Sequence, residues 1–137
     1  MMFAAHGDWR ILIVTPCVYI QPIGAFNKEG VLAFQRDAMQ QVAGYPAGSL
    51  VSAVIDLRRF ELNTADSNAV VQEYFAGIKQ RGYQRIDYIG ANVLAQQVLE
   101  ILWQGTNMEV HFHRDLDAFL ALCPAHQPAK NWLQSSQ

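Results

Sequence analysis

The chain has 137 residues, of which 51% are apolar, and ten Lys and Arg against twelve Asp and Glu give a formal net charge of −2. This apolar content can fill a core and excludes a chain that is disordered throughout, and the length suits one domain. The near-neutral charge offers nucleic acid and acidic lipid no electrostatic attraction, so neither is an expected partner. Two cysteines cannot form a disulfide framework, and we expect Cys17 and Cys123 to be reduced.

The start of the chain carries no signal for export or membrane insertion. Residues 11–14 are apolar but are followed by Thr15-Pro16, so the run is too short to span a bilayer. Arg10 is the only Lys or Arg before this run. We therefore expect a cytoplasmic protein without a membrane span.

Two strands, a helix and a third strand are predicted in the first part of the chain. Residues 10–16 and 18–23 are short and rich in Val, Ile and Tyr, and each contains a Pro that suits an edge or a bulge. Asn27 is a good N-cap for a helix that runs to about Val42. Residues 50–57 are nearly all apolar, as expected of a central strand that is covered on both faces.

Strands and helices then alternate to the end of the domain. Asn63 or Thr64 can cap a second helix, Asn92 a third and Asp115 a last one, with strands at 85–89 and 109–113 between them. Apolar residues three and four apart predict the buried stripe of each helix. These stripes are Val31, Phe34, Ala38 and Val42; Val70, Val71, Tyr74, Phe75 and Ile78; Leu94, Val98, Ile101 and Leu102; and Leu116, Phe119, Leu120 and Cys123.

The predicted order is β-β-α-β-α-β-α-β-α, which indicates an α/β fold. Strands that alternate with helices favour a mostly parallel sheet with right-handed crossovers and about four helices. The first two strands are expected to form an antiparallel hairpin at one side of the sheet. Residues 1–124 are assigned to this domain and 125–137 to a C-terminal tail, from which Trp132 and Leu133 can dock.

Four features, in order along the chain, resemble a STAS domain, the fold of sporulation anti-sigma-factor antagonists and sulfate-transporter tails. They are Gly24-Ala25-Phe26-Asn27 before the first helix, Val54-Ile55-Asp56-Leu57 in the central strand, Gly82 after the second helix, and 112–118 at the last strand and helix. The resemblance runs from about Trp9 to Cys123 and is closer to the divergent STAS-like or SEC14-like branch. It implies a regulatory module whose protein partner, an anti-sigma factor or a kinase-like protein, binds near the start of the second helix.

The sequence departs from that family at the phosphorylated step. In the antagonists, an Asp-Ser-Ser-Gly step caps the second helix and its first serine is phosphorylated by the partner kinase. Counting from Asp56 or back from Gly82 places Ala65 on that serine. The phosphate could fall instead on Thr64 or Ser67, where a helix N-terminus tolerates negative charge, or Thr64 could simply be an N-cap worth about 1 kcal/mol. The step reads Thr64, Ala65, Asp66, Ser67 or, after a shift of two residues, Asp66, Ser67, Asn68, Ala69.

Polar residues follow the carboxyl ends of the predicted strands, which is where open α/β sheets bind ligands. Asp56 and Arg58 could equally pair with each other or with loop backbone, so the placement does not identify an occupant. The candidate partner or ligand residues are Asn27, Asp56, Arg58, Thr64, Ser67, Gly90 and Asn92.

Evidence for metal binding or catalysis is sparse. His111 and His113 face the same side of a strand, but a metal site needs further ligands, and the candidates Glu109, Asp115, His6 and His126 are scattered in sequence. No G-x-S-x-G elbow or G-x-G-x-x-G loop is present. We therefore expect no cofactor and a non-enzymatic protein. The enzyme alternative, which we rank last, would use Asp56, His111 or His113.

Trp9, Trp103 and Trp132 lie near element ends, and they either form a partner or dimer face or cover the ends of the core. The first functional hypothesis is therefore a STAS-like interaction module, which could also form a homodimer. The alternative is a carrier of a small apolar ligand or lipid, motivated by the SEC14-like resemblance and the apolar composition.

Overall fold

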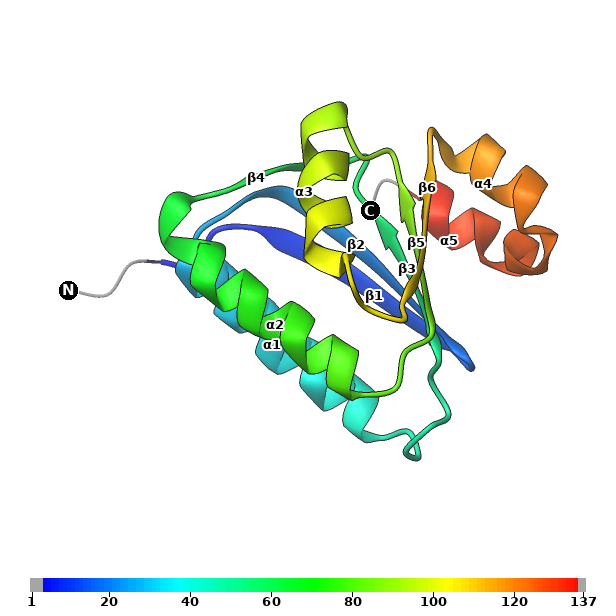
Figure 1. Cartoon of the computed structure of the whole chain (residues 1–137), viewed down its shortest axis with the longest axis horizontal. Helices are drawn as coiled ribbons and strands as arrows, with labels where there is room; N and C mark the ends of the chain where they lie inside the picture. Colours follow the sequence, from blue (N-terminus) through cyan, green and yellow to red (C-terminus); the bar gives the residue numbers. More distant parts are fainter. Residues whose placement is uncertain (1–3, 136–137) are drawn as a thin grey trace.

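The computed structural model describes residues 4–135 and shows a mixed sheet between two layers of helices (Figure 1). Helices α1, α2 and α3 cover one face, and α4, η2 and α5 cover the other. The strands are β1 (Asp8–Val14), β2 (Cys17–Phe26), β3 (Ser52–Asp56), β4 (Phe60–Asn63), β5 (Arg85–Ile89) and β6 (Glu109–His113). The helices are α1 (Lys28–Ala43), α2 (Asn68–Gln80), α3 (Val93–Trp103), α4 (Leu116–Leu122) and α5 (Lys130–Gln134), with 3-10 turns η1 (Ala65–Ser67) and η2 (Pro124–Ala129).

The strand order β1-β2-β3-β5-β6 confirms the predicted α/β fold. β1 pairs with β2 antiparallel at one edge, and the pairs β2–β3, β3–β5 and β5–β6 are all parallel. β3 lies in the middle of this order, and four of its five residues are buried, with Val54 fully buried. A parallel sheet covered on both faces requires such a strand.

The sequence did not predict β4, which extends the sheet beside β2. Residues 17–20 of β2 pair with β3, and residues 24–26 pair with β4, with a register shift between Gly24 and Ala25. Pro22, which has no N–H to donate, falls between these two stretches and so interrupts neither pairing. Most of β4 is exposed, so it is held mainly by backbone hydrogen bonds to β2. It therefore has no apolar pattern from which the sequence could have predicted a strand.

Alternation along the strands divides the core into two halves. Cys17, Tyr19 and Val54 face α4 and α5, whereas Val18 and Ile20 face the layer of α1, α2 and α3. The predicted stripes of the first, second and last helices are buried or partly buried, as expected. Asn27, Asn92 and Asp115 cap α1, α3 and α4 through their side-chain oxygens, as predicted.

The predicted buried stripe of the third helix is wrong for three of its four residues, and only Leu102 packs against the core as predicted. Leu94, Val98 and Ile101 are exposed, with relative accessibilities of 71%, 58% and 69%. Trp103 is buried, and Leu99 and Leu102 pack against the core from the opposite side of α3. Since α3 carries apolar residues around most of its circumference, periodicity alone could not choose the face that turns inward.

The segment after Pro124, expected as a tail, returns to the sheet as η2 and α5. Ala129 and Leu133 belong to the core between the sheet and α4, and Trp132 packs against it. Among the described residues, none of the helices is both long and apolar enough to cross a membrane.

Candidate functional site

Asp56, at the carboxyl end of β3, is fully buried and saturated with hydrogen bonds. Arg58 Nε and Nη2 donate to its two oxygens at 2.9 and 2.7 Å, and the Arg58 backbone N–H donates to Oδ1 at 3.0 Å. Gln21 Nε2 donates to Oδ2 at 2.9 Å. A bidentate guanidinium with further donors satisfies both oxygens of this buried carboxyl group.

The same network holds the end of α5. Arg58 Nη2 donates to the carbonyl oxygen of Leu133 at 2.8 Å. Arg10 Nη1 bonds Gln21 Oε1 and the carbonyl oxygen of Trp132 at 2.9 and 3.0 Å, and its guanidinium lies 4.2 Å above the Trp132 ring. Two arginines therefore satisfy carbonyl groups at the C-terminus of a helix, where positive charge is favourable.

Gly90 lies against this network. Its φ of +75° is in the left-handed region, and a Cβ added there would lie 2.5 Å from Cγ of Arg58. Any other residue at this position would be strained and would displace the Arg58 side chain, so glycine suits the close approach of these two loops. Asp56, Arg58 and Gly90 form one contiguous group, as their shared position at the carboxyl ends of strands suggested.

Asn27 and Asn92 accept hydrogen bonds from backbone N–H groups. Asn27 Oδ1 accepts from the N–H groups of Gly30 and His6 at 2.8 and 2.9 Å, so it caps α1 and holds the segment before β1. Asn92 Oδ1 accepts from Ala95 N–H at 2.8 Å. These bonds are those of helix caps.

Thr64 and Ser67 differ in accessibility. Thr64 is exposed and its hydroxyl donates to Asp66, whereas Ser67 is fully buried and its hydroxyl donates to the Thr64 carbonyl oxygen at 2.6 Å. Thr64 occupies the N-cap position of η1 and Ser67 that of α2, and neither side chain makes a capping bond. Asn63 ends β4, so neither Asn63 nor Thr64 caps α2 itself, contrary to the prediction. The 3-10 turn η1 precedes α2 and shifts the helix start to Asn68.

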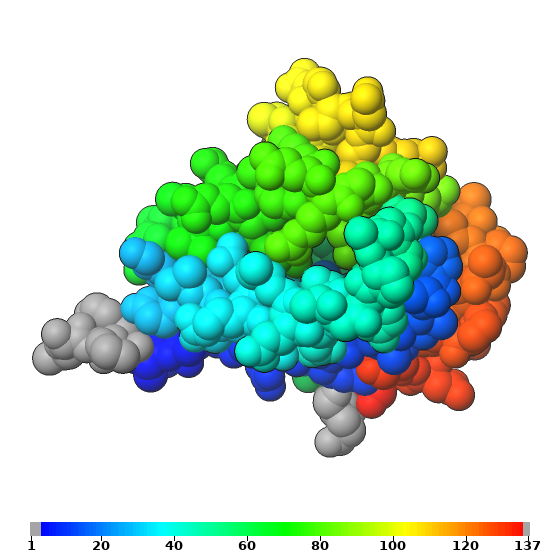
Figure 2. Space-filling view, turned by 90° about the horizontal axis from the view of Figure 1, so that it is seen from below, coloured from blue at the N-terminus to red at the C-terminus, as the bar shows by residue number. Residues whose placement is uncertain are grey.

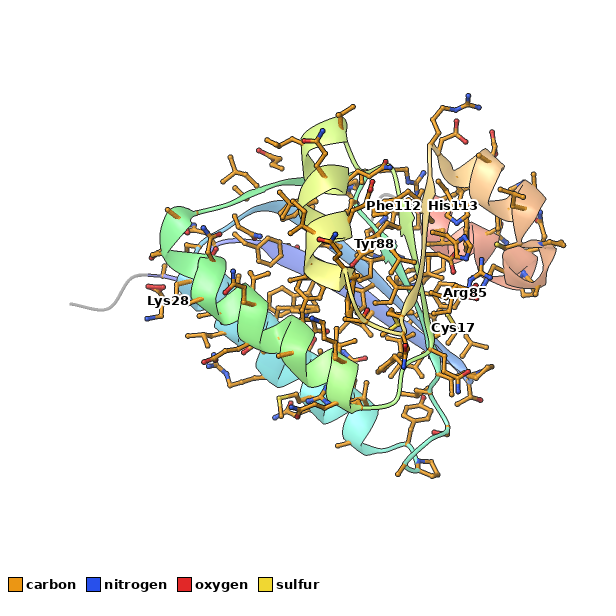
Figure 3. The ribbon with its side chains drawn as sticks, viewed as in Figure 1. Cys17, Lys28, Arg85, Tyr88, Phe112 and His113 are labelled. Atoms are coloured by element: carbon orange, nitrogen blue, oxygen red, sulfur yellow. The ribbon has the colours of Figure 1, made fainter. Side chains whose placement is uncertain are left out.

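A second buried polar group, on the α4 side of the sheet, was not expected. His113 Nε2 lies 2.8 Å from Asp87 Oδ1, and Arg85 Nε and Nη2 donate to the two Asp87 oxygens at 2.9 and 3.0 Å. Figure 3 shows Arg85 and His113 on this side, while Tyr88 points toward α3. Burial by itself raises the pKa of Asp87, but the bonds from Arg85 and His113 outweigh it and hold the pKa below 3.8.

The two strand histidines do not share a ligand set. His111 is partly exposed and lies 2.8 Å from Glu109 Oε2. Within residues 4–135, Asp87, His113 and Cys123 form a group whose potential ligand atoms lie within 4.8 Å of one another. Arg85 already neutralises Asp87, and its Nη2 lies 3.5 Å from Cys123 Sγ, so a metal ion would have to displace this guanidinium.

The chemistry available to this group is limited by burial. Cys123, His113 and Asp87 are the residue types of a nucleophile, a base and an orienting acid. However, burial, reinforced by the Asp87 carboxylate, raises the pKa of the Cys123 thiol despite the lowering effect of Arg85. A protonated thiol is a weak nucleophile, so we interpret the group as a structural ion-pair cluster.

His126 makes a further polar contact beneath α4. Its Nδ1 lies 2.5 Å from the Tyr19 hydroxyl, and its ring stacks on Phe119 with centroids 5.0 Å apart. Burial lowers the pKa of His126, which favours the neutral imidazole.

The sequence did not identify Arg10, Gln21, Arg85 and Asp87 as members of these networks. Arg85 and Asp87 are two residues apart and therefore share one face of a strand inside the sheet, which was the one available signal.

The tryptophans cover the core: Trp103 is 4% exposed and its indole N–H donates a hydrogen bond to the Tyr88 hydroxyl. Trp9 donates to Asp37 at 2.7 Å.

No protein-family model and no curated protein matches the chain. Solved structures do match. A protein of the DUF3478 family with a SpoIIAA-like fold, from Shewanella loihica PV-4, is 20% identical with a TM-score of 0.61, over 90% of this chain and all of that one.

Two further structures extend the likeness. The unphosphorylated anti-sigma factor antagonist SpoIIAA is 9% identical with a TM-score of 0.60, over 88% of this chain and 99% of its own. A murine anion transporter, solute carrier 26 family member A9, is 7% identical with a TM-score of 0.57, over 82% of this chain and 18% of the transporter. The resemblance to STAS domains is confirmed at the level of structure, and this chain has the SpoIIAA-like fold.

Proposed function

We propose that this chain is a regulatory module that acts by binding another protein rather than by catalysis. The proposal rests on one observation: the polar groups at the carboxyl ends of the strands are already hydrogen-bonded to other groups of this chain. Asp56 and Arg58 bind each other and the end of α5, and Asn92 caps α3. Their hydrogen-bonding capacity serves the fold, as expected of a scaffold that presents a surface.

The partner surface that we propose surrounds Thr64, at the start of η1 and close to α2. The SpoIIAA-like fold supports this choice, since one protein that shares the fold is an anti-sigma factor antagonist. Thr64 has an exposed hydroxyl, whereas the Ser67 hydroxyl is buried. If the partner is a kinase, Thr64 is therefore the hydroxyl of this pair that it can reach.

An apolar ligand receives less support from the structure. The cavity between α1, α2 and the sheet, lined by Ile20, Ala38 and Tyr74 among others, has about 20 Å³, room for about one water molecule. A wider depression of about 380 Å³ lies between the loops before β5 and β6, at the amino ends of the strands, but its lining includes the polar residues Lys79, Gln84 and Asn107, which do not suit a lipid. The described part of the chain thus favours a protein partner over a carried lipid.

The experiment compares captured proteins from cell extract on immobilised wild type, Thr64→Glu and Gln40→Glu. Both substitutions add one negative charge at an exposed position, and Gln40 lies on α1, outside the proposed surface. We expect Thr64→Glu to change the amount of one or more captured proteins at least fivefold, while Gln40→Glu matches wild type. Identical captured proteins for all three chains would remove Thr64 from the partner surface.

A further inference from the structure

We propose that the outer face of α3 is the contact surface of a homodimer in which two copies of this helix pack antiparallel. The apolar stripe consists of Val93, Leu94, Val98 and Ile101, whose exposures range from 58% to 76%. At 100° per residue these four side chains fall within an arc of about 140°. Figure 2 shows α3, in yellow, standing out from the rest of the surface. This proposal does not depend on the partner surface at Thr64.

Exposed apolar residues elsewhere are dispersed, which sets the stripe apart. Val14, Met39, Leu62 and Leu122 are also at least half exposed, but each lies on a different element. Single exposed hydrophobes are ordinary on soluble proteins, whereas a contiguous apolar patch marks an interaction site.

The charge of α3 disfavours lipid or nucleic acid as its occupant. Glu100 is the one charged residue between Val93 and Trp103, and its carboxylate accepts a hydrogen bond from Gln96 at 2.9 Å. Helices that bind membrane surfaces carry Lys or Arg beside their apolar face, and α3 has neither. An uncharged apolar stripe is best matched by another uncharged apolar stripe, which a second copy supplies.

The area agrees with a dimer contact. From their exposed fractions, the four side chains present roughly 400 Å² of apolar surface. One side of a standard interface covers about 800 Å², of which somewhat more than half is apolar. The stripe can thus supply the apolar centre of such an interface. The net charge of −2 per chain opposes association only weakly.

The stripe is also self-complementary, as a two-fold contact requires. An axis between Gln97 and Val98 places Leu94 of one copy opposite Ile101 of the other, and the reverse pair follows by symmetry. The two helices then run antiparallel, with each Val98 near the centre. The pairing of Leu94 with Ile101 is the feature that an experiment can address.

Sedimentation equilibrium across a range of concentrations tests the proposal. We expect wild type to approach twice 15.4 kDa as concentration rises, and Leu94→Glu or Ile101→Lys to weaken dimerisation at least about tenfold. The double variant places Glu opposite Lys at both pairs and should recover dimerisation. Leu122→Glu, a change at a 76% exposed residue on α4, is the matched control and should behave as wild type.

Three results would overturn the dimer. They are a wild type that stays at 15.4 kDa throughout, a control that weakens association as much as the α3 variants, and a double variant that remains monomeric. Circular dichroism of each variant confirms folding, which is expected because all the altered side chains are exposed. A monomeric wild type would leave the capture result for Thr64→Glu unaffected, so the two proposals fail separately.

Discussion

At the scale of single residues, Asp56 accepts four hydrogen bonds in the polar network at the end of the sheet. Asp56→Ala leaves Arg58 and Gln21 without their common acceptor. Arg58 also loses the carboxylate that orients it for its hydrogen bond to the Leu133 carbonyl oxygen in α5. Removing one partner of a buried pair costs about 3–5 kcal/mol, and because Arg58 is 31% exposed we expect the lower end of this range. Urea denaturation measures the change in the free energy of unfolding.

An exposed ion pair on the same chain provides the control. Arg114 and Asp115 pair at 3.2 Å with side chains that are 87% and 47% exposed. Arg114→Ala should change the free energy of unfolding by no more than about 0.5 kcal/mol. Equal losses for Asp56→Ala and Arg114→Ala would show that the buried network does not stabilise the fold.

Asp87 gives the second prediction at this scale, which concerns pH. Its pKa in the folded protein lies below the ordinary value of 3.8, so the unfolded chain binds more protons between these two values. The contribution of Asp87 to stability is therefore present above pH 3.8 and is lost as pH falls through the folded pKa. Urea denaturation at pH values from about 6 to 3 should show a shallower acid decline for Asp87→Asn than for wild type. Parallel curves for the two proteins would contradict the assignment.

At the scale of the elements, α5 is predicted to be part of the folded core. Leu133 is 1% exposed and packs with residues of β2, β3 and α4. Leu133→Ala should destabilise the protein by about 2–4 kcal/mol, because it leaves a cavity in a packed region. Leu122→Ala removes the same atoms at a position that is 76% exposed and should cost less than about 0.5 kcal/mol. Similar denaturation midpoints for these two variants would indicate that α5 is not held in the core.

The elements also show what local patterns can predict. The caps at Asn27, Asn92 and Asp115 depend on residues within a few positions, and all three were predicted. The inward face of α3 could not be predicted, because apolar residues lie around most of this helix. Leu94 and Leu102 both fit the predicted stripe, yet only Leu102 packs against the core. β4 was missed because its pairing with β2 relies on backbone groups, which every sequence carries.

At the scale of the whole molecule, the candidate site depended on contacts between distant segments. Topology correctly indicated that Asp56, Arg58 and Gly90 would lie together at one end of the sheet. That this group would bind the C-terminus of α5 could not be predicted, because the contact joins segments far apart in the sequence. Arg10 and Trp132, for example, are 122 positions apart. The Asp87 cluster likewise joins β5, β6 and α4, which only the folded chain brings together.

We propose that this chain acts through protein contacts and carries no small molecule. Native mass spectrometry of the chain purified under gentle conditions tests that claim most directly, since it weighs the intact assembly. We expect masses of 15.4 kDa and twice that value, and no additional mass in the native spectrum that is absent from the denaturing spectrum. A constant extra mass of a few hundred daltons, lost on denaturation, would contradict the claim and identify a ligand carrier.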